Sequence, residues 1–128
     1  MSQTGFKLLL DSSAWLAYFL GASKEVKGYI DTEATLLISS VLSIHEVKKK
    51  LLKQGVAKEA QNAIDFMKEN SIIIDVSDEI AEKAVNDCIE KKLHTVDSLI
   101  YRTAVENNAV VVTGDRDFEG LENVKILK

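Results

Sequence analysis

The stretch that decides the fold runs from Val110 to Phe118 and reads VVVTGDRDF. Its first half is a short apolar run of β-branched residues, which is typical of a buried strand. Its second half turns after Thr113 and then places Asp115 and Asp117 on either side of an arginine. A strand interior has no use for such a cluster, and an Asx-type turn needs only one aspartate. The stretch therefore predicts a strand that ends in an acidic loop.

Short apolar runs of the same kind recur along the chain. The predicted strands are Phe6–Leu10, Leu36–Ile38, Ile72–Ile74, Val110–Val112 and Val124–Leu127. Runs that are apolar throughout, and do not alternate with polar residues, are typical of strands in a parallel sheet that is covered on both faces.

Amphipathic stretches with helical spacing separate these runs. Ser12 and Ser13 are the expected N-caps of the first helix, which ends at Gly21. The predicted helices are Ala14–Leu20, Glu25–Ile30, Val41 to Gly55, Ala57–Asn70, a helix opened by Ser77 with its inner stripe from Ile80 to Ile89, and a helix capped by Thr95 that continues through Ala104. This alternation predicts one α/β domain over residues 1–128, with a parallel sheet flanked by helices on both faces.

The composition limits the classes of function. The chain has 128 residues, of which 46% are hydrophobic and 28% charged, and this balance argues against disorder. A net charge of −4 excludes a strongly basic nucleic-acid binder. The single cysteine, Cys88, can form neither an internal disulfide nor a multi-cysteine zinc site, which favours a cytoplasmic protein. No signal peptide or membrane span is predicted.

Five acidic residues are predicted to lie at one edge of the sheet. In open α/β sheets, ligands bind outside the carboxyl ends of the strands. Asp11 ends the first strand, and Asp115 and Asp117 follow the fourth. Glu46 lies about a turn and a half into the helix that leaves the second strand. Asp97 lies in the first turn of the helix before the fourth strand, so it belongs at the same edge.

Carboxylates gathered in this way repel one another unless a cation neutralises them. Oxygen ligands without histidine or thiolate favour Mg²⁺ or Mn²⁺ over zinc. One or two such ions, roughly 4 Å apart when paired, activate water and hold a phosphodiester in line for attack. The acids therefore predict metal-dependent phosphodiester hydrolysis.

Each acid also has an ordinary structural explanation. Asp11 could cap a helix, and Asp97 could interact with a helix dipole. Asp115 and Asp117, next to a glycine, could form an Asx-type turn. Glu46 could form surface ion pairs with Lys49 and Lys50 at helical spacing. The order of the acids along one small domain, and no single acid, favours a site.

Four segments give the chain its resemblance to a known family. They are LLLDSSAWLAYF, SSVLSIHEVKKKL, LHTVDSLIYRTA and VVVTGDRDFEGL. In this order and spacing, from Phe6 to Leu127, the chain resembles the PIN domain family and most closely its compact VapC-type toxins. The resemblance implies a sheet of about five parallel strands and a Mg²⁺- or Mn²⁺-dependent endoribonuclease that cleaves single-stranded or structured RNA. It also implies a homodimer and a small antitoxin partner.

The resemblance also assigns roles to the acids. The family's acids match Asp11, Glu46, Asp97 and Asp115, which become the candidate catalytic residues. Asp11, Asp97 and Asp115 would hold the metal, and Glu46 would complete its shell or orient the attacking water. Asp117 is a further or alternative ligand.

Two hydroxyls and several cations complete the candidate site. Ser12 and Thr113 match hydroxyl positions of the family and would hold the ligands in place. Lysines follow Glu46 along its helix, and their ordinary explanation is a solvated face. Lys49, Lys50 and Arg116 are the candidates for contacts with the RNA backbone.

Other functions remain as alternatives. A PIN ribonuclease of RNA processing or decay, or a non-catalytic PIN scaffold that binds RNA or protein, would have nearly the same sequence. A signalling receiver domain needs a paired acid after the first strand, and a haloacid-dehalogenase-type phosphatase needs Asp-x-Asp there. The chain has a single aspartate followed by two serines, and no glycine-rich phosphate loop.

Overall fold

Five parallel strands form the sheet, in a spatial order that differs from their order along the chain. The computed structural model describes residues 7–32 and 35–128, so that Phe6 lies outside the described residues. The spatial order of the strands is β3-β2-β1-β4-β5, and all neighbours are parallel. Their bounds are β1 Lys7–Leu10, β2 Leu36–Ser40, β3 Ile72–Ile74, β4 Val110–Thr113 and β5 Val124–Ile126. The predicted parallel α/β fold is confirmed.

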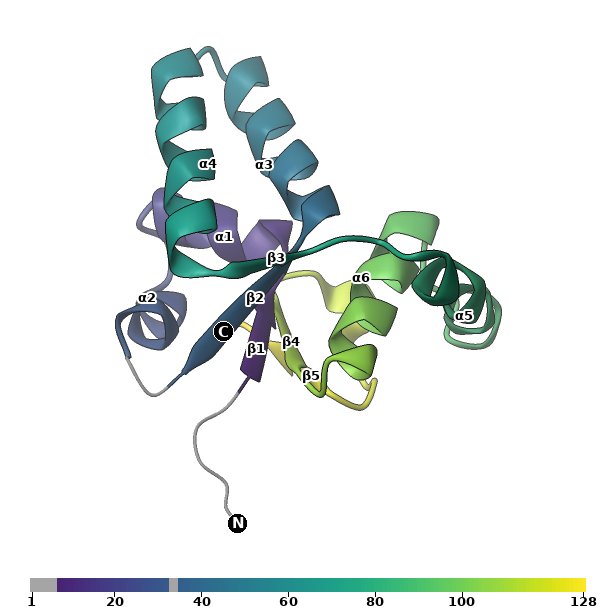
Figure 1. The fold of residues 1–128 in the computed structure, drawn as a ribbon. Helices are drawn as coiled ribbons and strands as arrows, with labels where there is room; N and C mark the ends of the chain where they lie inside the picture. Colours follow the sequence, from purple (N-terminus) through teal and green to yellow (C-terminus); the bar gives the residue numbers. More distant parts are fainter. Residues whose placement is uncertain (1–6, 33–34) are drawn as a thin grey trace.

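Helices cover both faces of this sheet, as predicted (Figure 1). Helices α1 to α4 gather on one face, where α3 and α4 form a hairpin, and α6 covers the other face with α5 packed beside it. The bounds are α1 Ser12–Phe19, α2 Lys24–Asp31, α3 Val41–Lys53, α4 Ala57–Asn70, α5 Asp78–Glu90, α6 Thr95–Glu106 and the 3₁₀ turn η1 Arg116–Phe118. None of the helices within the described ranges has both the length and the apolar character required to cross a membrane.

The two faces of β1 show how the core is divided. Leu8 and Leu10 pack with the first layer of helices, around the fully buried Trp15. Leu9 points to the opposite face and packs with Ile100 of α6. Successive side chains of a strand alternate between faces, so an apolar run is buried completely only when both faces are covered.

The first helix begins differently from the prediction. Asp11, and neither Ser12 nor Ser13, is the N-cap of α1, and its side chain accepts a hydrogen bond from the backbone N–H of Ala14. Asp and Ser are equally good caps, so the residue that leaves the strand in an extended conformation takes the position.

Two later helices also differ in detail from the prediction. Thr95 is the first residue of α6 and not its cap, which is His94 without a side-chain hydrogen bond. In α5 the predicted inner stripe is partly wrong, because three of its residues are exposed and Asp87, which was not part of it, is buried. The three exposed residues are Ala81, Val85 and Ile89. An ion pair with α6 holds Asp87 inside. The predicted cap at the start of α5 is confirmed.

Candidate metal centre

The candidate site lies where the strand order changes direction. From β1 the chain continues to β2 and β3 on one side, whereas β4 and β5 lie on the other side. Ligands bind in the crevice outside the carboxyl ends of strands at such a switch point. Leu10 of β1 pairs with Val112 of β4. The residues that follow, Asp11 and Thr113, therefore lie next to each other at this crevice.

Asp11 is buried at the crevice and held by three donors. Its Oδ1 accepts hydrogen bonds from the Ser13 hydroxyl at 2.6 Å and from the Ala14 N–H at 2.9 Å. Its Oδ2 accepts one from the Thr113 hydroxyl at 2.5 Å. Burial raises the pKa of Asp11 above its usual value, and the charge of Glu46 adds to the rise, while the hydrogen bonds oppose it. The carboxylate thus caps α1 and contributes negative charge to the crevice.

Two hydroxyls connect Asp11 to the loop after β4. The Thr113 hydroxyl, which is fully buried, also accepts the backbone N–H of Asp115 at 2.9 Å. The Ser13 hydroxyl accepts the N–H of Gly114 at 2.8 Å. The contact that the sequence suggested for Ser12 is thus made by Ser13, because the hydroxyl two residues after the cap reaches back to it. Helical spacing could not distinguish between two adjacent serines.

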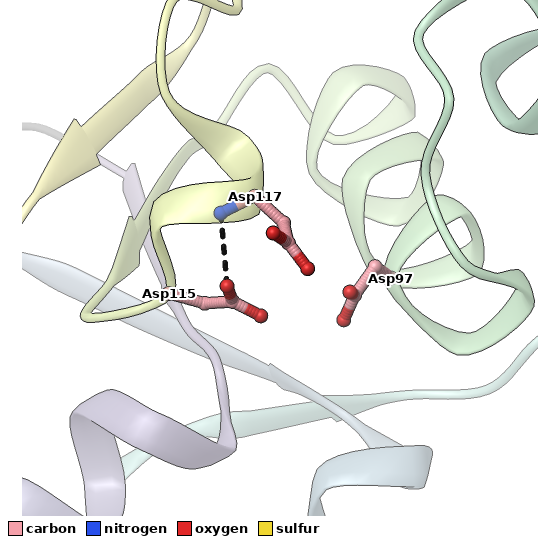
Figure 2. A group of neighbouring side chains, drawn as sticks. All are labelled: Asp97, Asp115 and Asp117. Carbon is pink, nitrogen blue, oxygen red and sulfur yellow. Dashed lines mark hydrogen bonds between the residues drawn. The ribbon is translucent and has the colours of Figure 1, made fainter.

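Three aspartates from two segments converge beside this network. One carboxylate oxygen each from Asp97, Asp115 and Asp117 lies within 4.8 Å of the others. Figure 2 shows Asp97, from the first turn of α6, facing the pair after β4. Asp115 caps η1 by accepting the N–H of Asp117 at 2.9 Å. The structure therefore brings Asp117 to the predicted acids.

The charges in the crevice act on one another. Burial, followed by the charges of Asp115, Asp11 and Glu46, raises the pKa of Asp97 from 3.8 to about 6, while His94 opposes the rise. Across residues 7–32 and 35–128, no lysine or arginine lies within ion-pair distance of Asp11, Asp97 or Asp115. Within the described ranges, these three acids thus lack a lysine or arginine as a counter-charge.

Glu46 faces the crevice from α3. It is half-buried, and its charge contributes to the raised pKa of both Asp11 and Asp97. The surface ion pairs with Lys49 and Lys50 that its helical spacing allows do not form among the described residues. The charge of Glu46 therefore acts on the crevice aspartates and is not neutralised by Lys49 or Lys50.

Two exposed basic residues lie beside the aspartates. Arg116 is exposed and pairs with Glu119 at 2.7 Å. The exposed His94 ring lies 4.0 Å from the carboxylate of Asp117. In the sequence His94 was only a further candidate for contact with the RNA backbone, and its position directly before the helix that carries Asp97 is the signal that places it beside the acids.

These residues suit a hard divalent cation. Every side chain that converges is a carboxylate, and oxygen ligands of this kind favour Mg²⁺ or Mn²⁺. Asp97, Asp115 and Asp117 are close enough to share one ion, with Asp11 and Glu46 adding negative charge around it. The arrangement can hold a cation and neutralise a phosphate beside it.

Comparisons with known proteins agree with the fold. The family model described as PIN domain matches residues 8–123. A toxin–antitoxin complex from Klebsiella pneumoniae has 25% identity and a TM-score of 0.76, over 92% of this chain and 95% of that chain. VapC20 from Mycobacterium tuberculosis, a sarcin–ricin-loop-cleaving toxin, has 15% identity and a TM-score of 0.75, over 94% and 96%. VapBC2 from Rickettsia felis, bound to a promoter DNA fragment, has 17% identity and a TM-score of 0.78, over 96% and 100%. A search of curated protein sequences gives no significant match.

Proposed function

The chain belongs to the PIN domain family, and from this premise we propose that it is a metal-dependent endoribonuclease of the VapC toxin type. The observation that carries the proposal is the convergence of carboxylates at the switch-point crevice, where no lysine or arginine of the described residues lies within ion-pair distance of Asp11, Asp97 or Asp115. Such an arrangement is costly for folding unless a cation neutralises it, so its retention supports a function.

The proposed roles follow from the positions of the residues. Asp97 and Asp115 would hold Mg²⁺ or Mn²⁺, and Asp117 is close enough to them to serve as a further ligand. Asp11, whose charge acts on Asp97, is proposed as a ligand from the resemblance to the family. The ion, when bound, activates water and stabilises negative charge on the phosphodiester. Glu46 orients the attacking water from the α3 side.

The hydroxyls hold this arrangement in place. Thr113 and Ser13 fix the orientation of the Asp11 carboxylate, so that it does not turn away when its charge is neutralised. The Thr113 hydroxyl also accepts a hydrogen bond from the backbone N–H of Asp115 and so holds Asp115 next to Asp11.

A small antitoxin is the proposed protein partner. The toxin–antitoxin complex from Klebsiella pneumoniae, similar over nearly the whole of both chains, supports this proposal. An acidic crevice is blocked well by an arginine, whose planar guanidinium fits carboxylates. A homodimer is proposed from the family as well, and size-exclusion chromatography with light scattering tests it.

An RNA-cleavage assay tests the proposed activity. The wild-type protein should cleave RNA with Mg²⁺ or Mn²⁺ and lose this activity with a chelator, and Asp97→Asn should be inactive with either metal. Asp65→Asn, an exposed acid on α4, is the matched control and should retain full activity. Binding of RNA without cleavage would contradict the enzymatic proposal and favour a non-catalytic PIN scaffold.

A further inference from the structure

A hollow of about 510 Å³ lies beside the acidic crevice. Ser13, whose hydroxyl donates to Asp11, and Glu46, whose charge acts on Asp97, both line this hollow. Lys49, Lys50 and Lys53 of α3 line the same hollow. It thus joins the acidic crevice to a surface rich in positive charge.

The lysines of this hollow have no acidic partner among the residues that the structure describes. Lys83 pairs with Glu79 one helical turn away, which shows that such pairs form in this protein. Lys50 stands at the same spacing from Glu46, yet neither it nor Lys49 or Lys53 is within ion-pair distance of an acid in the part of the chain that the structure describes. Their charges are therefore available to an anion from outside.

The lysines also lead away from the acids in one direction. Along the axis of α3, Lys50 lies about 6 Å and Lys53 about 10 Å beyond Glu46, at 1.5 Å per residue. Figure 1 shows α3 extending away from the sheet from the end of β2, and this end belongs to the carboxyl edge that carries the acids. Positive charge therefore continues from the crevice for about two turns of helix.

We propose that Lys49, Lys50 and Lys53 bind successive backbone phosphates of the RNA strand as it leaves the acidic crevice, on one side of the cleaved bond. The proposal rests on the proposed function for its ligand. A protein with a net charge of −4 and an acidic centre needs local cations to hold an acidic polymer. These lysines contact the backbone and not the bases, so they contribute affinity without sequence preference.

Salt-dependent binding tests the proposal separately from catalysis. A fluorescein-labelled oligouridine of about 20 nucleotides, longer than typical single-strand site sizes, is titrated with the Asp97→Asn protein at several KCl concentrations. The dissociation constant is measured by fluorescence anisotropy. Adding Lys49→Gln, Lys50→Gln and Lys53→Gln together should make the slope of log affinity against log salt shallower by about 2, because each phosphate that a lysine neutralises on single-stranded RNA accounts for about 0.7 of that slope.

The matched control removes the same charge elsewhere. Lys48→Gln, Lys58→Gln and Lys68→Gln together change exposed lysines of α3 and α4 that do not line this hollow. This triple variant should keep the slope of the protein with all its lysines. Equal slopes in the two triple variants, or no measurable binding of the oligonucleotide, would overturn the proposal. A shallower slope together with a wild-type protein that cleaves no RNA would support the lysine contacts and refute only the enzymatic proposal.

Discussion

Two groups of buried or half-buried acids in this protein have opposite surroundings, and their pKa values shift in opposite directions. Between α5 and α6, Asp87 is fully buried and receives two hydrogen bonds of 2.8 Å from Arg102 and a contact of 3.2 Å from Lys91. Burial would raise the pKa of Asp87, but the hydrogen bonds from these two cations outweigh it and lower the pKa below its usual value.

At the switch-point crevice the balance is reversed. Asp11 and Asp97 have raised pKa values because of burial, which no lysine or arginine among the described residues offsets, and because neighbouring carboxylates add to the rise. An acid that is paired with a cation of the same protein has a structural role, as Asp87 has in joining α5 to α6. Buried acids without such a cation lower the stability of the folded protein. Binding of a cation from the solvent is expected to restore that stability.

The largest effect is expected from Asp11→Asn. Asn caps helices as well as Asp does, so the fold should be retained while the negative charge is removed. RNA cleavage should fall by a factor of about 10³ or more, because loss of a residue that only supports a ligand already costs 10–100-fold. Circular dichroism and a cleavage assay with Mn²⁺ measure the two effects. If the Asp11→Asn protein were active, Asp11 would not belong to the catalytic site and its only role would be to cap α1.

The opposite result is expected on the other side of the comparison, from Arg102→Met. This change leaves Asp87 buried without its main partner and should lower the free energy of unfolding by about 3 kcal/mol, measured by urea denaturation. Cleavage by the folded fraction should be unchanged. The double variant Asp87→Leu with Arg102→Met should cost less than Arg102→Met alone, because no buried charge remains unpaired. A double variant that is less stable than the single one would contradict the structural role.

Thr113→Val should have a smaller effect on activity. Valine has the shape of threonine but cannot hold the Asp11 carboxylate, so cleavage should fall about 10-fold or somewhat more. Thr113→Ser restores a hydroxyl at the same position and should recover most of the activity. If the valine and serine variants were equally active, the hydroxyl would have no positioning role.

The smallest effect concerns pH and stability. The pKa of Asp97 is about 6 in the folded protein against a usual 3.8, so the folded state binds this proton more tightly than the unfolded state. The metal-free protein should therefore gain stability as the pH falls from 7.5 through 6. Compared with Asp97→Asn, the gain between pH 7.5 and 5.5 should be about 0.5 kcal/mol, allowing for the half-exposed position. Urea denaturation with a chelator at pH 7.5 and 5.5 measures the free energy of unfolding of both proteins. An equal change with pH in the two proteins would show that Asp97 does not have a raised pKa in the folded state.

The sequence predicted the fold well because its signals are local. Apolar runs mark the strands, and the residue that ends each run must lie at the carboxyl edge, which is why Asp11 and Asp115 could be placed correctly at this edge. Contacts between distant segments were less accessible. No periodicity shows that Asp87 turns inward to Arg102, and none decides whether Ser12 or Ser13 reaches Asp11.

The central claim is that the crevice acids, which no lysine or arginine of the described residues neutralises, bind a divalent cation. Titration calorimetry with Mn²⁺ tests this claim most directly. The wild-type protein and Asp97→Asn are compared at pH 7.5, where Asp97 with its pKa of about 6 is ionised. We expect Mn²⁺ to bind the wild-type protein, and to bind Asp97→Asn at least about 10-fold more weakly with the fold unchanged. Equal affinity of the two proteins, or no binding to the wild type, would contradict the account.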